Sequence, residues 1–274
     1  MNIIAEMPSQ PGQLLAEEPL VLREDYNGVT TLTLNRPKQF NALSQAVLSA
    51  LQNELDAIAQ DASIRVVVLA AAGKAFCAGH DLKEMRSHTD QAFHSALFAQ
   101  CSCVMLTINH MPQPVIAKVQ GLATAAGCQL VAACDLAVAA DSAQFATSGI
   151  RVGLFCSTPA VAVSRNLSRK KALEILLTGE FIDAHTARQE GLINRVVPAE
   201  QLDAAVQQLI DAIVAKSPTA VASGKRMFYQ QLEMGMAEAY DYAAEIMACD
   251  MLNEDAGEGI DAFLQKRQPV WRGR

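Results

Sequence analysis

Residues 113–135, QPVIAKVQGLATAAGCQLVAACD, constrain the fold more than any other part of the sequence. The short apolar run PVIAKVQG, which ends at a glycine, predicts a buried strand. A turn of small residues follows, and then the run LVAACDLAVAA predicts a helix that leads into a further strand. Alternating strands and helices predict right-handed crossovers, with helices packed on a parallel sheet. The stretch therefore predicts an α/β protein.

The chain before residue 160 continues this alternation, and the chain after it is mainly helical. Two alternating runs around Tyr26-Asn27-Gly28 predict a hairpin over 20–35. Apolar periodicity and run length predict the other elements: helices over 42–60 and 90–111, strands over 65–71 and 114–121, a glycine-punctuated loop over 73–85, and helices over 166–179, 184–192, 199–215 and 217–266. We expect a flexible tail over 1–19, an α/β core over 20–200 and a helical oligomerisation region over 201–274.

Composition excludes several classes of protein. With 51% hydrophobic and 19% charged residues, the chain can form a sizeable core. A formal charge of −7 argues against a nucleic-acid binder, although a local basic cluster can still hold an anion. The seven cysteines are an odd number and most lie in apolar runs, which favours buried thiols in a reducing compartment. Cys101-Ser-Cys103 is a poor metal motif, so we expect no metal site.

The sequence also carries expectations about location. No apolar run reaches the roughly 18 residues of a membrane helix, so no membrane association is expected. The N-terminal sequence MNIIAEMPSQPGQLLAEEPL has no basic region of a signal peptide and no Arg-rich amphipathic pattern. We therefore predict a cytoplasmic protein.

Two segments can offer backbone N–H groups to a ligand. In Cys77-Ala78-Gly79-His80-Asp81, the glycine allows a tight turn after a strand, and Ala125-Ala126-Gly127 opens a helix. Small residues let a ligand approach the main chain, and the helix dipole favours negative charge there. Two converging N–H groups would form an oxyanion hole, although close packing alone can also explain such small residues.

Motifs in order along residues 20–272 resemble the crotonase superfamily, the enoyl-CoA hydratase/isomerase family. They are LTLNRPKQFNALS (32–44), RVVVLAAAGKAFCAGHDLKEM (65–85), PVIAKVQGLATAAGCQLVAACDLAVAADSAQFA (114–146), GLINRVVP (191–198) and AFLQKRQPVW (262–271). Through AGHDLKE, GLATAAGCQLVA, VGLFCSTP and FLQKRQPVW, the chain is most similar to the branch of enoyl-CoA hydratase domain-containing protein 3.

This resemblance implies a crotonase-like spiral of ββα units, a helical C-terminal trimerisation region, and trimers or pairs of trimers that bind acyl-CoA. It assigns the oxyanion hole to the backbone N–H groups of His80 and Ala126. Coenzyme A enters as part of the substrate rather than as a separate cofactor. The residues assigned to its binding are Lys38, Gln39, Phe40, Cys77, Ala78 and Asp81, with Phe263 and Lys266 at the adenosine end, in the same or a neighbouring subunit.

The sequence departs from the family at the two glutamates that hydratases use. The pattern GGGCEL reads AAGCQL here, which places Gln129 at the first position, and the second falls on Gly149 in TSGI. Hydration needs one group to take a proton from water and another to protonate the α-carbon, and an amide can do neither. Gln129 lies one turn after Ala126, so we expect it to face the same site and to orient water at most.

Other residues are possible substitutes for the missing glutamates. The His80 side chain titrates near neutrality, but a local hydrogen bond or a position in solvent is the favoured interpretation. Cys156 is best interpreted as a buried thiol, since no activating histidine lies nearby in sequence. Ser157 is a speculative catalytic residue that can equally cap a helix. Asp81 is expected to fix its loop.

The sequence thus predicts an acyl-CoA thioester-binding protein that performs an enolate-stabilising reaction other than efficient hydration. Decarboxylation of a malonyl-type thioester and isomerisation are candidates. The alternatives are a non-catalytic acyl-CoA-binding or regulatory protein, and a thioesterase. Restoring both glutamates, by Gln129→Glu with Gly149→Glu, would test whether only the acid/base pair has been lost.

Overall fold

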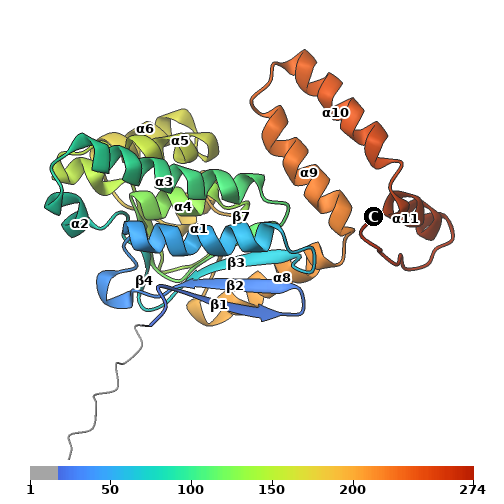
Figure 1. Ribbon diagram of the computed structural model, residues 1–274, viewed down its shortest axis with the longest axis horizontal. Coiled ribbons are helices and arrows are strands. Elements are labelled where there is room, and N and C mark those ends of the chain that lie inside the picture. The colour runs from blue at the N-terminus through green and yellow to red at the C-terminus, as the bar shows by residue number, and fades with distance from the viewer. Residues whose placement is uncertain (1–17) are drawn as a thin grey trace, which may run out of the picture.

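A six-stranded sheet forms the base of the protein in the computed structural model, which describes residues 18–274 (Figure 1). The predicted tail over 1–19 lies, except for its last two residues, outside the described residues. The strands in spatial order are β1 (Val21–Tyr26), β2 (Val29–Leu34), β3 (Val66–Ala71), β5 (Val115–Val119), β7 (Leu136–Ala140) and β10 (Arg195–Val197). Only β1 and β2 pair antiparallel in this sheet; the other pairs are parallel. The predicted α/β class is confirmed.

A second, smaller sheet is built from short strands that follow those of the first. Its order is β4 (Ala75–Cys77), β6 (Leu122–Thr124), β8 (Gln144–Ala146) and β9 (Ile182–Asp183). The strands β4, β6 and β8 run parallel, and β9 pairs antiparallel with β8. The chain therefore passes through both sheets in each turn, from β3 to β4, from β5 to β6 and from β7 to β8, before the next helix.

Eleven α-helices cover these sheets and continue beyond them in the described chain. They are α1 (Gln45–Ala59), α2 (Leu82–Ser87), α3 (Gln91–His110), α4 (Ala126–Ala133), α5 (Ser157–Asn166), α6 (Arg169–Thr178), α7 (Ala184–Gln189), α8 (Leu202–Val214), α9 (Pro218–Gln231), α10 (Met236–Asp250) and α11 (Glu254–Leu264). Short 3-10 turns lie at η1 (Pro37–Gln39), η2 (Ser148–Val152) and η3 (Ala199–Gln201). The predicted hairpin is confirmed, and its turn residues Asn27 and Gly28 have φ of 49° and 77°.

The predicted loop over 73–85 is partly wrong, because it contains strand β4 and the start of helix α2. These elements have three and six residues, too few for an apolar period to show. Both matter for the site, since they carry its first backbone segment.

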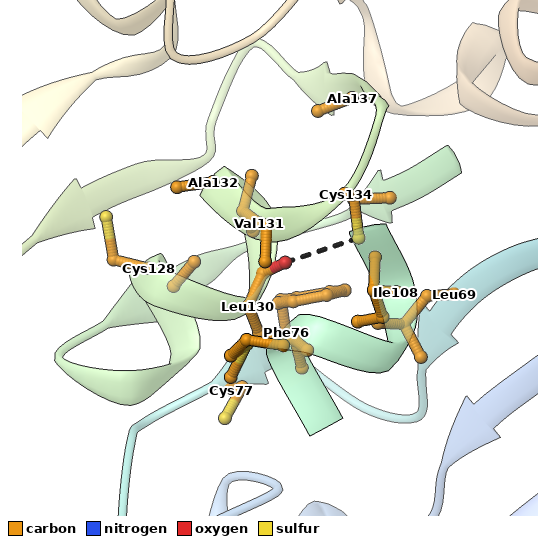
Figure 2. Packing of buried hydrophobic residues seen from close by; sticks show 14 of the residues in the cluster. Leu69, Phe76, Cys77, Ile108, Cys128, Leu130, Val131, Ala132, Cys134 and Ala137 are labelled. Atoms are coloured by element: carbon orange, nitrogen blue, oxygen red, sulfur yellow. Dashed lines mark hydrogen bonds between the residues drawn. The ribbon is translucent and has the colours of Figure 1, made fainter. Parts of the chain in front are cut away.

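The core lies between the six-stranded sheet and helices α1, α3 and α4. Strand β3 illustrates the alternation, since Val67 and Leu69 join the large cluster on this side while Val66 and Val68 pack toward α8 on the other. Figure 2 shows residues of α4 packed in the large cluster, with Leu130 next to Phe76. The Cys134 thiol, just after the helix, donates to the Leu130 carbonyl at 3.2 Å. Five of the seven free cysteines are buried, as predicted.

Helix α3 is an exception to the expectation that no segment could span a membrane. By length and composition alone it is long and apolar enough to do so. Five of its side chains nevertheless pack in the core cluster: Leu97, Cys101, Val104, Met105 and Ile108. The helix is accordingly a layer of the protein body.

Helices α9, α10 and α11 leave the body as an arm (Figure 1). Lys225 on α9 anchors the arm: its ammonium donates to the Asp135 carboxylate at 2.7 Å and to two main-chain carbonyls. Tyr229, one turn later, donates to the same carboxylate at 2.8 Å. Helix α10 has no buried residue, and large apolar side chains of the arm are exposed, among them Leu232, Met236, Tyr240, Met247, Met251, Leu252, Phe263 and Leu264.

Candidate active site

The segments that follow β4 and β6 meet because these strands are parallel neighbours, which places their carboxyl ends at one edge of the small sheet. Glycines allow the contact. A β-carbon on Gly79, whose φ is +93°, would lie 2.8 Å from the Ala125 β-carbon and 3.3 Å from the Ala126 nitrogen. A β-carbon on Gly127 would lie 2.1 Å from the Cys77 carbonyl oxygen. Any larger residue would separate the two segments.

Two backbone N–H groups remain free where these segments meet. The Leu43 N–H donates to the Gly79 carbonyl at 2.8 Å, and the Asp81 N–H donates to the Leu43 carbonyl at 3.1 Å. This bridge uses the groups on either side of His80 and leaves the His80 N–H without a partner among the described residues. Ala126 is the first residue of α4, so its N–H has no acceptor within the helix. Two such donors can hold developing negative charge on an oxygen.

Both residues line a cavity of about 200 Å³. The cavity brings together five of the predicted site residues: Ala78, His80, Ala126, Gly149 and Ser157. The remaining wall is mostly apolar and was not predicted: Leu82, Met85, Phe98, Val152, Leu154, Phe155 and Pro159. These side chains come from α2, α3 and the stretch from the end of η2 to the first turn of α5. Apolar periodicity does not reveal which of them face a ligand rather than the core.

The imidazole of His80 belongs to a residue of this wall, and its one polar neighbour within residues 18–274 is the Leu43 carbonyl. Both ring nitrogens are buried and have no partner among the described residues. The ring meets Phe98 edge-on, with centroids 5.3 Å apart. Burial lowers the pKa of His80 from its ordinary 6.5, and the nearby Leu43 carbonyl opposes this shift in part. The side chain therefore does not point to solvent, and its one local polar neighbour in the described chain is the Leu43 carbonyl, as a local interaction expected from the sequence would require.

Gln129 lies on α4 one turn after Ala126 but is not among the residues that line the cavity. Its side chain is buried, and its Oε1 atom has no hydrogen-bond partner among the described residues. An orphaned amide oxygen of this kind is costly in a core, which makes this position unusual.

Gly149 lines the cavity, but no side chain fits there. A β-carbon at this position would lie 2.6 Å from the Leu154 carbonyl oxygen and 2.8 Å from the Cys156 sulfur. The Gly149 N–H also donates to that sulfur at 3.3 Å. The space beside Gly149 is therefore occupied by its neighbours, so a glutamate introduced at position 149 alone would collide with them.

Hydroxyl groups line the same part of the cavity. Ser157 opens α5, and its Oγ atom makes only a 3.5 Å contact with the Phe155 carbonyl. Ser148 is hydrogen-bonded to Thr124, with 2.6 Å between the two hydroxyl oxygens. These groups can bond a ligand but are not bases at neutral pH.

The predicted coenzyme A segments adjoin the cavity. Lys38, Gln39 and Phe40 are exposed on and after η1, and the Ala78 N–H donates to the Phe40 carbonyl at 3.0 Å. This bond holds the segment Lys38–Phe40 against the segment Cys77–Asp81. Lys74 lies 5.1 Å from the Phe40 ring centroid, which adds a cation near the same loop.

The side chains of Cys77 and Asp81 have structural roles. Burial raises the pKa of the Cys77 thiol to about 12. Asp81 caps α2 through the Lys83 and Glu84 N–H groups and pairs with Arg36 at 3.2 Å. Burial raises the pKa of Asp81, but these hydrogen bonds and Arg36 outweigh it, so the net pKa is lowered. Asp81 thus fixes its loop.

Phe263 lies near the end of α11 and Lys266 two residues after it, and neither lines the cavity of the same chain. Figure 1 shows α11 in the arm, far from α2 and α5, which contribute to the cavity wall. Phe263 is 82% exposed and Lys266 has φ of 55°. Among residues 18–274, no group of three or more His, Cys, Asp or Glu side chains could hold a metal ion.

Comparison with known proteins places the chain in a family. The sequence profile of the family described as enoyl-CoA hydratase/isomerase matches residues 24–274. The chain belongs to the enoyl-CoA hydratase/isomerase family. A crystal structure of enoyl-CoA hydratase from Mycobacterium smegmatis superimposes with a TM-score of 0.92 at 57% identity, covering 93% of this chain and 99% of that one. The fold is the crotonase-like one that the sequence predicted.

The predicted branch is confirmed as well. This chain is 44% identical to rat enoyl-CoA hydratase domain-containing protein 3, mitochondrial, over 96% of this chain and 88% of the rat protein. The crystal structure of the human protein of that name has a TM-score of 0.90 at 44% identity, covering 92% of this chain and 100% of the other.

These names contradict the predicted cytoplasmic location, because the rat and human relatives are named as mitochondrial proteins. The prediction rested on the lack of a signal-peptide or Arg-rich amphipathic pattern in the first residues, together with the free thiols. Neither observation separates the cytoplasm from another reducing compartment, so the prediction was wrong.

Proposed function

We propose that this protein binds an acyl-CoA thioester and polarises its carbonyl through the backbone N–H groups of His80 and Ala126. The observation that carries the proposal is the convergence on an apolar cavity of two N–H groups that have no partner among residues 18–274. A thioester offers what this cavity lacks: one carbonyl oxygen for the donors and an apolar chain for the wall. No separate cofactor is needed, since coenzyme A is part of the substrate.

Efficient hydration of an enoyl thioester is not the proposed reaction. Gln129 cannot deprotonate water, and the position of Gly149 is filled by the Cys156 sulfur and the Leu154 carbonyl. Reactions that need only enolate stabilisation and one proton carrier fit the site better, isomerisation among them. Decarboxylation of a malonyl-type thioester is a weaker candidate, because no Lys or Arg of residues 18–274 lines the cavity to bind its carboxylate.

Binding of coenzyme A would use Lys38, Gln39 and Phe40 beside the cavity, with Phe263 and Lys266 contributed by a neighbouring copy. The arm supports this arrangement, since Phe263 is 82% exposed and lies among other exposed apolar side chains that a second subunit would cover. We therefore propose a trimer or a pair of trimers, which light scattering would identify as three or six copies of the chain.

A non-catalytic acyl-CoA-binding protein is the second candidate, favoured by the occupied space beside Gly149. A thioesterase is weaker, since burial raises the pKa of Cys156 and keeps it a thiol rather than a nucleophilic thiolate.

One experiment separates the candidates. The purified protein is incubated with enoyl-, 3-hydroxyacyl-, malonyl-type and saturated acyl-CoAs, and products and retained ligands are identified by mass spectrometry. Conversion of one class names the reaction, retention without conversion identifies a binding protein, and neither outcome with any thioester would sink the proposal.

A further inference from the structure

We propose that the imidazole of His80 is the acid/base group of this site, and that it carries the α-proton of a bound uncharged acyl thioester. This inference rests on the proposed thioester binding and adds the group that would perform chemistry there. His80 would then contribute twice, with its main-chain N–H holding the carbonyl oxygen and its ring taking the proton.

The geometry separates His80 from the other residues of the wall. His80 lines the cavity, and both of its ring nitrogens are buried with no hydrogen-bond partner of good geometry among residues 18–274, so the cost of burying them is not repaid by a hydrogen bond there. A ligand atom or water in the cavity would supply the missing bond. The edge-on contact with Phe98 holds the ring in place without using either nitrogen.

No other group in the wall can perform the same task at neutral pH. Within the described part of the chain, Cys156 is the one further titratable side chain that lines the cavity, and its sulfur already accepts the Gly149 N–H. The pKa of its thiol is raised by burial, which keeps it protonated. Serine and threonine hydroxyls are too weakly basic.

A single proton carrier suffices for a balanced reaction. A ring nitrogen takes the proton from the α-carbon, and the electrons of that C–H bond form a double bond to the thioester carbon. The carbonyl oxygen becomes an enolate oxygen, which the two backbone N–H groups hold. Return of the proton to the α-carbon gives exchange, and its return to the γ-carbon of an enoyl chain gives isomerisation. No oxidant, water or second acid is consumed.

The charge state of the ring agrees with this role. Because burial lowers the pKa of His80 below 6.5, the imidazole is neutral at pH 7 and can accept a proton. The titratable groups on the elements around it are otherwise engaged or set apart: Asp81 with Arg36, Glu84 with the Gln45 N–H, His94 beyond the Phe98 ring, and Cys156 with the Gly149 N–H. Proton transfer should therefore weaken only as pH falls below the pKa of His80.

The test follows deuterium uptake from heavy water at the α-carbon of hexanoyl-CoA, measured by mass spectrometry on the full-length protein. Binding of the same thioester is measured in parallel by native mass spectrometry. The variants His80→Ala and His80→Gln keep the main-chain N–H and remove the base. His94→Ala is the matched control, since His94 also has a buried unpartnered ring nitrogen near Phe98 but does not line the cavity.

We expect both His80 variants to bind hexanoyl-CoA and to lose exchange by at least about 10²-fold, while His94→Ala exchanges like the wild type. The wild-type rate should also fall on the acidic side, and the residual rate of the His80 variants should not follow that profile. Equal exchange in His80→Ala and the wild type would overturn the assignment. Binding of the thioester by the wild type without exchange would also overturn the assignment of His80. If the wild type did not bind the thioester, the proposed function itself would be refuted.

Discussion

Gly149→Ala tests whether the missing carboxylate left an open place or a filled one. The added β-carbon would lie 2.6 Å from the Leu154 carbonyl oxygen and 2.8 Å from the Cys156 sulfur, closer than packed atoms allow. Overpacking of this kind costs about 1–3 kcal/mol. The alanine also lowers the backbone entropy of the unfolded chain, which stabilises the folded state by about 0.4–1 kcal/mol. We therefore expect a net destabilisation between about 0 and 2.6 kcal/mol, which lowers Tm by up to roughly 10 °C for a domain of this size.

The matched control is Gly224→Ala in the middle of α9. No atom lies within 4 Å of a β-carbon built there, so the same change should stabilise the helix by about 0.5–1 kcal/mol. Urea unfolding and thermal melting of both variants measure the difference in sign. If Gly149→Ala were as stable as Gly224→Ala, the segment over 149–156 would be free to move, and the argument from occupied space would fail.

The same reasoning revises the restoration experiment. We expect Gln129→Glu combined with Gly149→Glu to show no hydration of crotonyl-CoA, because the second carboxylate has no room to reach the cavity. Measurable hydration by that double variant would show that the cavity wall yields easily.

Two further predictions concern the arm. Lys225→Met leaves the Asp135 carboxylate buried without its cation, and urea unfolding should show a loss of about 3–5 kcal/mol in stability. Lys118→Met removes the cation of an exposed pair and should cost at most about 1 kcal/mol. Similar costs in the two variants would refute the anchoring role of Lys225. Hydrogen bonds from Arg267 and the Val270 N–H lower the pKa of Glu258 from 4.5 to about 2, so its stabilising effect is present above pH 4.5 and is lost as pH falls toward 2. The fluorescence of Trp271, the single tryptophan, should report this loss of stability. In Glu258→Gln the fluorescence should no longer change over this pH range. An unaltered pH profile in that variant would exclude Glu258 as the cause of the change.

The sequence was most informative where an element is long or a turn demands special residues. Helix α1 follows from apolar periodicity, strands β3 and β5 follow from short continuous apolar runs, and the hairpin follows from Asn27-Gly28. Strands of two or three residues, such as β6 and β9, leave no period to detect. Their pairing is decided by long-range packing, which local sequence does not encode.

The site was predictable in part for a similar reason. Family motifs identified the residues that surround the cavity donors, and Gly79 and Gly127 mark where two segments approach closely. The state of the His80 ring was not predictable, because whether a side chain finds a partner depends on every neighbour in space. The collision at Gly149 likewise arises from Leu154 and Cys156 folding back over it.

The free donors at His80 and Ala126 belong to the main chain, and this affects how such a protein can change over generations. A point mutation replaces a side chain but leaves the N–H in place, unless it introduces proline. Heritable variation can therefore exchange or erase the acid and base groups around the cavity while the grip on a carbonyl oxygen persists. A lineage built this way can lose one reaction and gain another without first losing its ligand.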